Sequence, residues 1–267
     1  MSDDEHESKP ARDRSQVTII DIARMAGVSK KTVSRVINES PLVREETRKK
    51  VKEIIAETGF TPNPQARALA FRKSFLVGLV YDNPSPQYVV NMQRGILDTL
   101  GDTAFQLVLR PCDRGDENYR ERVRSFIVQH KPHGIILTPS VSEDETLAEI
   151  LREEECDYVR IASLELDVPS RSIRTHDAQG AEMAAAHLAQ LGHKRIGHIH
   201  GPKTFRSAHE RLSGFRSGLE SYGLELAPEL TVEGAYTFDS GVSSATRLLN
   251  RRDRPTAIFA GNDEMAV

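Results

Sequence analysis

One predicted helix near the start of the chain presents polar and basic side chains on its outward face, namely Lys30, Lys31, Ser34 and Arg35. Lysine and arginine neutralise phosphate charges and can donate hydrogen bonds to O6 and N7 of guanine in the major groove. Lysine is a flexible point charge, so it reads bases less strictly than arginine does. The chemistry that this face offers is the recognition of DNA.

Two short helices position this face. Thr18 precedes an apolar run with helical spacing and can cap the first helix, while the Asp21 carboxylate favours the positive end of the helix dipole. Gly27 can supply the positive φ that ends this helix, and Ser29 can cap a second helix over residues 30–38. The side chains expected to point inward are Ile19, Ile22, Ala23, Ala26, Val33, Val36 and Ile37.

A third helix and a short connecting segment follow. The apolar spacing in VREETRKKVKEIIAETG predicts a helix that completes a small three-helix domain over residues 16–61. In residues 62–74, Asn63 can cap and Pro64 suits the first position of a short helix. A helix of this length is barely stable alone in water, so we expect it to order only when something stabilises it. The alternative is a plain linker.

Charge is distributed unevenly along the 267 residues. The net charge of the whole chain is -3, but residues 16–73 carry +6, residues 1–15 carry -2 and residues 74–267 carry -7. A basic head on an acidic body is typical of a DNA-binding module joined to a domain that does not touch DNA, although chance clustering remains the alternative. Residues 1–15 are poor in apolar side chains and are expected to form a disordered tail.

The location of the protein can also be predicted from composition. No apolar run approaches the roughly 20 residues of a membrane span, and the acidic, polar start is unlike a signal peptide. We therefore expect a cytoplasmic protein associated with the nucleoid and no contact with membranes. Cys112 and Cys156 lack the spacing of a metal or redox motif and are expected to be free thiols.

The head and the connecting segment resemble one known family. The run VTIIDIARMAGVSKKTVSRVIN, followed by REETRKKVKEII, TGF, PN and ARAL, is similar to the DNA-binding head and hinge of the lactose and galactose repressor (LacI/GalR) family. The resemblance implies that Lys30 and Lys31 read bases and that Ser34 and Arg35 approach bases or phosphates. It also implies phosphate contacts from Thr18, Ser29, Thr32 and Asn38, and a minor-groove hinge helix that includes Asn63, Gln65, Ala66 and Leu69.

Leu69 matches the leucine that family members wedge into the central base step. An apolar wedge unstacks a step at a cost of a few kcal/mol and bends the duplex, so it must come from a rigid element such as a hinge helix. For Lys30 and Lys31 we expect G·C pairs beneath the side chains, and the alternative is that both lysines contact only phosphates.

Beyond residue 75 short apolar runs alternate with amphipathic segments. FLVGLVY, FQLVLR, GIILT, YVRIA, RIGHIH and TAIFAG are typical of buried strands, and the segments between them are typical of helices. This alternation predicts an α/β effector domain built from doubly wound parallel sheets covered on both faces. Ligands of such folds bind beyond the carboxyl ends of the strands.

The family resemblance continues over HDAQGAEMAAAHLAQLGHKRIGHIHGP, ERLSGFRSGLESYG and PTAIFAGNDEMA. These segments are similar to the family's effector-binding domain, which is like periplasmic sugar-binding proteins with two lobes. The resemblance implies that Arg211 grips the effector, Ser207 and Asn262 are polar contacts, and Tyr236 stacks on it. Asp82 and Asn83, after the first strand, are expected contacts from the other lobe. Arg211 could instead serve as a structural ion-pair partner.

Two features depart from the family pattern. His176 stands where many members have an aspartate, immediately before Asp177, which weakens the prediction of carbohydrate recognition by that route. The sequence stops at Val267, soon after Asn262 and Asp263 predict the start of a helix. We therefore expect the effector-binding and dimerisation domain, residues 75–267, to be incomplete at its C-terminal end.

The sequence lacks the motifs of other chemistries. His193, His198 and His200 have no carboxylate or cysteine partners at the spacing of a metal site. GxSxG, P-loop, HExxH and GxGxxG motifs do not occur, so no catalytic residue, metal or cofactor is predicted.

The sequence as a whole predicts a sequence-specific transcriptional regulator that is not an enzyme. We expect a repressor that binds a pseudo-palindromic operator as a homodimer and responds to a small molecule such as a sugar or related metabolite. One alternative, a solute-binding protein for a sugar-like ligand without DNA binding, explains the body but not the basic head. A second, an enzyme on a doubly wound fold, would need a catalytic constellation.

Overall fold

The computed structural model describes residues 17–37, 39–61 and 74–267. The chain divides into two compact units, Met1–Phe71 and Arg72–Val267. Part of the predicted DNA-binding set lies outside the described residues, so those predictions stay predictions: Asn38, Asn63, Gln65, Ala66 and Leu69.

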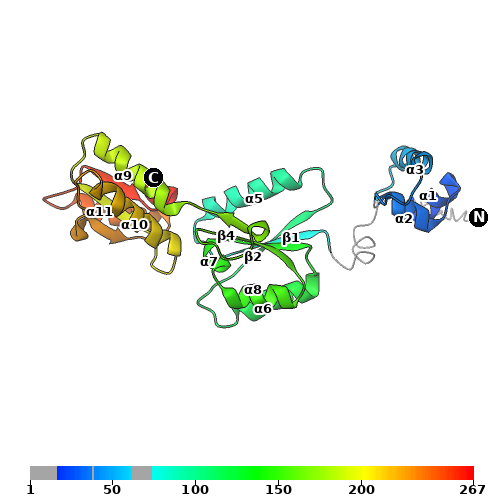
Figure 1. The fold of residues 1–267 in the computed structure, drawn as a ribbon, viewed down its shortest axis with the longest axis horizontal. Coiled ribbons are helices and arrows are strands. Elements are labelled where there is room, and N and C mark those ends of the chain that lie inside the picture. Colours follow the sequence, from blue (N-terminus) through cyan, green and yellow to red (C-terminus); the bar gives the residue numbers. More distant parts are fainter. Residues whose placement is uncertain (1–16, 38, 62–73) are drawn as a thin grey trace, which may run out of the picture. The chain divides into compact units, whose positions relative to one another are not determined.

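Three helices form the first unit: α1 (Ile19–Ala26), α2 (Lys30–Ile37) and α3 (Glu45–Thr58) (Figure 1). The predicted cap of α1 is present, because the Asp21 amide donates to Thr18 Oγ1 (3.4 Å) and the Thr18 amide donates to Asp21 Oδ2 (3.1 Å). Gly27 ends α1 in the left-handed conformation with φ 68°, which a glycine adopts without steric cost.

The core of this unit joins the three helices. Ile22, Val33 and Val51, one from each helix, are fully buried, and Phe60 packs against the cluster from the segment after α3. The inward faces predicted for α1 and α2 are therefore confirmed. Burial of these faces leaves the polar side of α2 at the surface.

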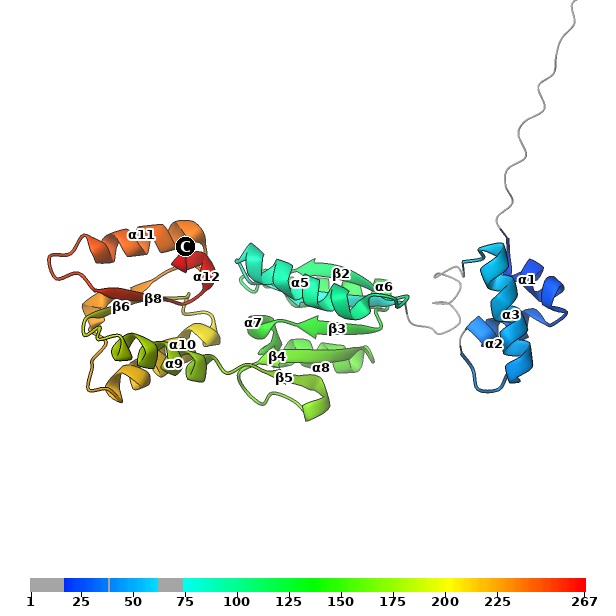
Figure 2. The same cartoon turned by 90° about the horizontal axis from the view of Figure 1, so that it is seen from above.

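The second unit begins with a lobe built on a parallel sheet in the order β2-β1-β3-β4-β5. Its strands are β1 (Leu76–Tyr81), β2 (Gln106–Pro111), β3 (Gly134–Leu137), β4 (Asp157–Ala162) and β5 (Ser172–Arg174). Its helices are α5 (Pro86–Leu100), α6 (Tyr119–His130), α7 (Pro139–Ser142) and α8 (Glu145–Glu153). Figures 1 and 2 show α5 on one face of the sheet and α6 and α8 on the other.

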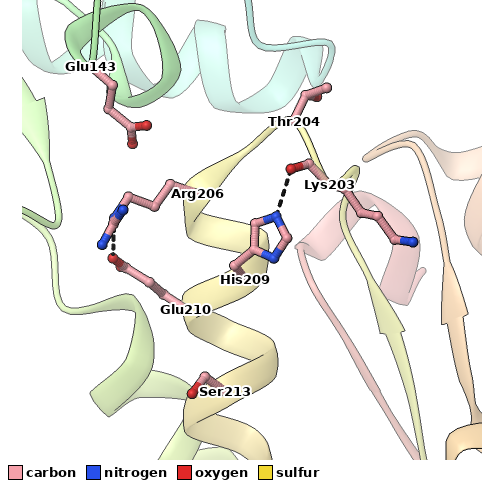
Figure 3. Close-up of a pocket in the computed structure, with 7 residues that line it drawn as sticks. All are labelled: Glu143, Lys203, Thr204, Arg206, His209, Glu210 and Ser213. Carbon is pink, nitrogen blue, oxygen red and sulfur yellow. Dashed lines mark hydrogen bonds and ion pairs between the residues drawn. The ribbon is translucent and has the colours of Figure 1, made fainter.

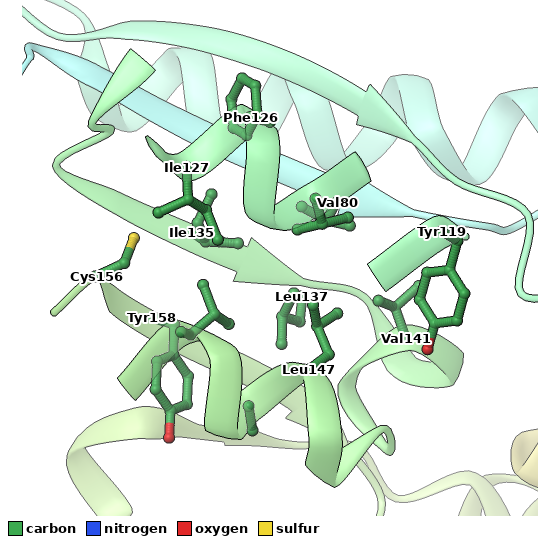
Figure 4. Close-up of a cluster of buried hydrophobic side chains, with 13 residues drawn as sticks. Val80, Tyr119, Phe126, Ile127, Ile135, Leu137, Val141, Leu147, Cys156 and Tyr158 are labelled. Atoms are coloured by element: carbon green, nitrogen blue, oxygen red, sulfur yellow. The ribbon is translucent and has the colours of Figure 1, made fainter. Parts of the chain in front are cut away.

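The main core of this first lobe lies between the sheet and helices α6 and α8 (Figure 4). Val80 and Leu137 come from neighbouring parallel strands, and they pack with Val123 of α6 and Leu147 of α8, all four of them fully buried. In contrast, α5 has a single buried residue, Val89, which is 7% exposed. The α6 and α8 face is therefore the well-packed side of the lobe.

A second lobe follows, with a parallel sheet in the order β7-β6-β8. Its strands are β6 (Ile196–His200), β7 (Thr231–Glu233) and β8 (Ala257–Ala260), and its helices are α9 (Asp177–Gln190), α10 (Arg206–Glu220), α11 (Phe238–Leu249) and α12 (Asp263–Ala266). Helices α9 and α10 pack together on one face of this sheet, and α11 covers the other face (Figure 2). The predicted α/β architecture with parallel sheets is confirmed in both lobes.

Strands β5 and β7 were not predicted from the sequence, and neither was α7. Both strands are three residues long, lie at the edge of their sheets and contain no extended apolar run. Periodicity is too weak a signal over three residues, so only pairing with a neighbouring strand defines them. The six predicted apolar runs all form strands.

Candidate DNA-binding face and interlobe site

Helix α2 carries the predicted base-reading residues on one accessible side. Lys30 and Lys31 are exposed, and Ser34 and Arg35 are half-buried beside them. Val33 and Val36 on the opposite side are buried against α1 and α3. The helix is therefore anchored by its apolar side, and its first turn is free to approach a groove.

Hydroxyl groups lie at the starts of α1 and α2. Ser29 Oγ accepts a hydrogen bond from the Thr32 amide (3.1 Å) and lies 2.9 Å from Thr32 Oγ1. Thr18 Oγ1 donates to Asp21 Oδ2 at 2.6 Å, which is the main reason that the Asp21 pKa lies below its usual value. These predicted phosphate contacts thus sit at helix N-termini, where backbone N–H groups favour anions.

In the first lobe, the predicted effector contact Asp82 follows β1 and already has two partners. Its Oδ2 accepts from Arg114 Nε at 2.7 Å, and its Oδ1 accepts from the Ser140 hydroxyl. Arg114 also donates to the Thr204 carbonyl of the second lobe at 3.0 Å. Asn83 Oδ1 accepts from the Ser85 amide (2.9 Å), which shapes the turn into α5.

In the second lobe, Arg211 of α10 forms an ion pair with Asp177, the first residue of α9. Its Nη2 lies 2.7 Å from Asp177 Oδ1, and its Nη1 donates to the Gly261 carbonyl. The Thr175 hydroxyl donates to Asp177 Oδ2 at 2.7 Å. Arg211 is therefore a structural ion-pair partner, the alternative that the sequence left open, while about a third of its side chain stays accessible.

Tyr236 is buried (3% exposed), and its ring lies against Gly201 after β6. Burial raises the pKa of its phenol, and Ser207 and Arg211 act in the opposite direction. Asn262 fixes the Tyr236 backbone by donating from Nδ2 to its carbonyl at 3.1 Å. Asn262 Oδ1 also accepts from the Met265 amide, which is the helix cap that the sequence predicted.

Tyr88, in the first turn of α5, is a residue that sequence reasoning missed. Burial raises its pKa to about 12, with Asp177 and Asp82 adding to the rise and Arg211 opposing it. Charges from both lobes thus act on one phenol. The charged side chains that act on the Tyr88 pKa are the predicted residues Asp82 and Arg211 and the unpredicted residue Asp177.

A pocket of about 420 Å³ also lies between the lobes (Figure 3). Glu143, from the loop after α7, faces residues of α10 and of the loop before it, and burial raises the pKa of its carboxyl. Arg206 Nε pairs with Glu210 Oε1 at 2.9 Å within the pocket. The predicted effector residues do not line it: the full lining is Glu143, Lys203, Thr204, Arg206, His209, Glu210 and Ser213.

A local signal could have found Tyr88. Ser85 and Pro86 come four and five residues after the end of a predicted strand and are typical of a helix start, so Tyr88 had to lie near the carboxyl end of the sheet. Arg114 carried no such signal, because its partner Asp82 is 32 positions away.

The described part of the chain gives no sign of a metal site or a membrane span. No group of three or more His, Cys, Asp or Glu side chains among those residues could hold a metal ion. His198 and His200 instead bond to the carbonyls of Phe259 and Gly201, at 2.9 and 2.7 Å. No helix in the described ranges is long and apolar enough to cross a membrane.

Comparison with protein families matches both units. Residues 18–63 match the bacterial regulatory proteins of the lacI family, and residues 185–267 match the periplasmic binding protein-like domain. The first match covers the helix pair with the exposed lysines. The second covers most of the lobe that contains Arg211, Tyr236 and Asn262.

Similar proteins extend these matches over nearly the whole chain. Catabolite control protein A of Priestia megaterium is 34% identical over 94% of this chain and 75% of its own length. The structure of the lac repressor dimer bound to operator and the anti-inducer ONPF has a TM-score of 0.67 and 28% identity, over 94% of this chain and 76% of that one.

A complex of the transcriptional regulator CelR with cellobiose has a TM-score of 0.61 and 31% identity, over 93% of this chain and 75% of that one. The similarity to the CelR structure extends over the two-lobed unit as well as the head. The 34% identity to catabolite control protein A over 94% of this chain places both proteins in one family. The chain therefore belongs to the LacI family of bacterial transcriptional regulators, and it is a sequence-specific DNA-binding protein.

Proposed function

We propose that this protein represses transcription by binding a pseudo-palindromic operator as a homodimer, and that a small neutral polyhydroxylated molecule, such as a sugar, controls the binding. The observation that carries the proposal is the face of α2, where exposed lysines stand on a helix anchored by buried Val33 and Val36. We assign residues 16–61 to DNA recognition, 62–74 to the hinge and 75–267 to effector binding and dimerisation.

On this proposal, residues of the head contact the operator in two ways. Lys30 and Lys31 read bases in the major groove, supported by Ser34 and Arg35, and Thr18, Ser29 and Thr32 bind phosphates at helix N-termini. Asn38 and the hinge residues Asn63, Gln65, Ala66 and Leu69 complete the interface, with Leu69 as the minor-groove wedge.

Apolar side chains on α5 support a homodimer. Val90 and Leu97 are seven positions apart on one side of the helix and are each 52% exposed, with Leu109 of β2 also exposed. Helix α11 exposes Phe238, Val242 and Leu249 in the same way. A second copy of the chain would cover these stripes, and two heads are required to occupy a palindromic site.

The charges around Tyr88 support a neutral effector. Arg114 is paired with Asp82, and Arg211 is paired with Asp177, so neither guanidinium offers an uncompensated positive charge to an anion. The carboxylates, guanidinium groups and phenol can instead exchange hydrogen bonds with hydroxyl groups. The contacts proposed are Asp82, Asn83, Ser207, Arg211, Tyr236 and Asn262, to which we add Tyr88 and Asp177.

A DNA titration tests the proposal. Fluorescence anisotropy of a labelled operator-length duplex is measured at several salt concentrations, with cellobiose, ribose and glucose 6-phosphate as probes. We expect a steep salt dependence, because phosphate contacts release counterions, and a response to a neutral sugar but not to the sugar phosphate. Salt-insensitive or absent DNA binding contradicts the DNA-binding proposal, and a response confined to the phosphate contradicts the neutral effector.

A matched pair of variants sharpens the titration. Lys30→Ala/Lys31→Ala removes two charges from α2, while Lys49→Ala/Lys50→Ala removes two exposed charges from α3. Only the α2 pair should abolish discrimination between operator and unrelated DNA, because base contacts specify sequence whereas distant charges add a uniform attraction. Equal loss of discrimination in the two variants contradicts the assignment of α2 as the reading helix.

A further inference from the structure

A carboxylate of the second lobe reaches the start of a helix in the first lobe. Glu264 lies in the first turn of α12, and its Oε1 accepts hydrogen bonds from Ser85 Oγ at 3.2 Å and from the Gln87 amide at 3.1 Å. Ser85 and Gln87 flank Pro86, the first residue of α5. The contact therefore joins residues 179 and 177 positions apart in the sequence.

The position of Glu264 satisfies groups that α5 leaves unpaired. The first amide groups of a helix have no partner inside the helix, and Pro86 has no N–H, so the Gln87 amide is the first that needs an acceptor. Ser85 Oγ already accepts from the Tyr88 amide at 3.3 Å. A carboxylate at this end is further favoured by the helix dipole.

The Glu264 contact can exist only while the two lobes are close together. Two other polar contacts cross between the lobes: Arg114 Nη2 donates to the Thr204 carbonyl at 3.0 Å, and Ser163 Oγ donates to Glu210 Oε1 at 2.7 Å. Each of these involves a loop residue of the first lobe. Glu264 differs because it contacts the N-terminus of a 15-residue helix, which moves as a rigid element.

We propose that Glu264 is a closure latch: it caps α5 across the interlobe cleft and holds the two lobes together. Through Ser85 it also positions the turn that carries Tyr88, so closure and the placement of the phenol are one event. Helix α5 also bears the exposed Val90 and Leu97, so the latch connects the cleft to an outer surface of the unit. The latch does not depend on the identity of the effector.

Hydrogen exchange of the intact chain tests the latch. Glu264→Ala removes the acceptor, and Asp263→Ala is the matched control, because Asp263 is the neighbouring carboxylate of the same turn and is exposed. In Glu264→Ala we expect amides in peptides spanning residues 84–92 to exchange roughly tenfold faster, since a charge-assisted hydrogen bond is lost. The control should exchange as the wild type does.

A distance measurement provides the second readout. Spin labels at Glu121→Cys in α6 and Glu220→Cys in α10, both exposed sites, report on lobe separation when Cys112 and Cys156 are replaced by alanine. We expect a longer and broader distance distribution in Glu264→Ala than in Asp263→Ala. The proposal is overturned if Glu264→Ala leaves both the amide exchange of residues 84–92 and the distance distribution unchanged. It is also overturned if Glu264→Ala and Asp263→Ala have equal effects.

A conservative variant covers the case in which Glu264→Ala disrupts the second lobe, which faster exchange in β6 would reveal. Glu264→Gln keeps an acceptor oxygen but loses the charge that favours the helix end. In Glu264→Gln, the amides of residues 84–92 should exchange at a rate between those of the wild type and Glu264→Ala, and the amides of β6 should exchange as in the wild type. Wild-type exchange in Glu264→Gln at residues 84–92 overturns the proposal that charge at the helix end holds the latch.

Discussion

Asp177 and Arg211 form an ion pair between the start of α9 and the second turn of α10, with Nη2 and Oδ1 2.7 Å apart. The Asp177 side chain is 9% exposed and the Arg211 side chain 31% exposed, so the carboxylate partner is shielded while the arginine remains partly accessible. The same guanidinium also bonds to the Gly261 carbonyl after β8. One arginine thus ties α9, α10 and the end of a strand while remaining available to a ligand.

Arg211→Met should lower the free energy of unfolding of the second unit by about 2 kcal/mol, because the largely shielded Asp177 carboxylate would lose its cation. Urea unfolding followed by circular dichroism measures this loss. Arg216→Met on the exposed side of α10 is the control and should change stability by less than about 0.5 kcal/mol. Equal stability of the two variants would contradict a structural role for the ion pair.

His198 should make the second unit sensitive to acid. The ring is fully buried and stacks on Phe259, and burial lowers its pKa to about 4, with His200 and Arg211 nearby adding to the fall. An unfolded histidine titrates near 6.5, so between about pH 6.5 and 4 the unfolded chain binds more protons than the folded one. The stability that the neutral His198 contributes is therefore fully present above about pH 6.5 and is lost as the pH falls toward 4.

The contribution of His198 can be isolated by substitution. The shift corresponds to about 3 kcal/mol over that pH range. His198→Leu should flatten the pH dependence of the unfolding free energy, measured by urea titration from pH 4 to 8. His187→Leu, at an exposed position of α9, should retain the wild-type slope. A wild-type slope in His198→Leu would exclude His198 as its source.

Gly201 should tolerate no side chain while Tyr236 is present. A Cβ atom at this position would overlap the Tyr236 ring, which is itself packed edge-on against Phe205. Gly201→Ala should destabilise the unit by about 2 kcal/mol through overpacking. When Tyr236 is already replaced by alanine, adding Gly201→Ala should cost less than it does in the wild type, because the clashing ring is gone. Additive losses in the double variant would contradict the steric explanation.

Lys31 should contribute to sequence discrimination at one operator position. Lys31→Ala is compared with the wild type over a set of duplexes in which each base pair is substituted in turn, with anisotropy as the readout. If Lys31 reads a base, the variant loses its preference for one base pair at one operator position. The binding cost of a mismatch there, ordinarily about 1–3 kcal/mol, then disappears. Uniform weakening at all positions would assign Lys31 to phosphate contact only.

Much of the local structure followed from the sequence because its causes are local. Thr18, Gly27 and Ser29 fixed the ends of α1 and α2, since caps and positive-φ glycines act within one turn. The six longer strands followed from short runs rich in apolar residues, as expected for sheets covered on both faces. The exposed lysines followed from the helical period.

The sequence by itself thus determined the helix pair, the α/β class of the body and the family resemblance. The tertiary structure alone decided which charges meet: Arg211 with Asp177, Arg114 with Asp82, and Glu264 with the first amide of α5. These partners lie 32 to 177 positions apart, and a carboxylate is equally compatible with solvent, an ion pair or a helix end. Only the packing of two lobes, which depends on many distant contacts at once, selects among those environments.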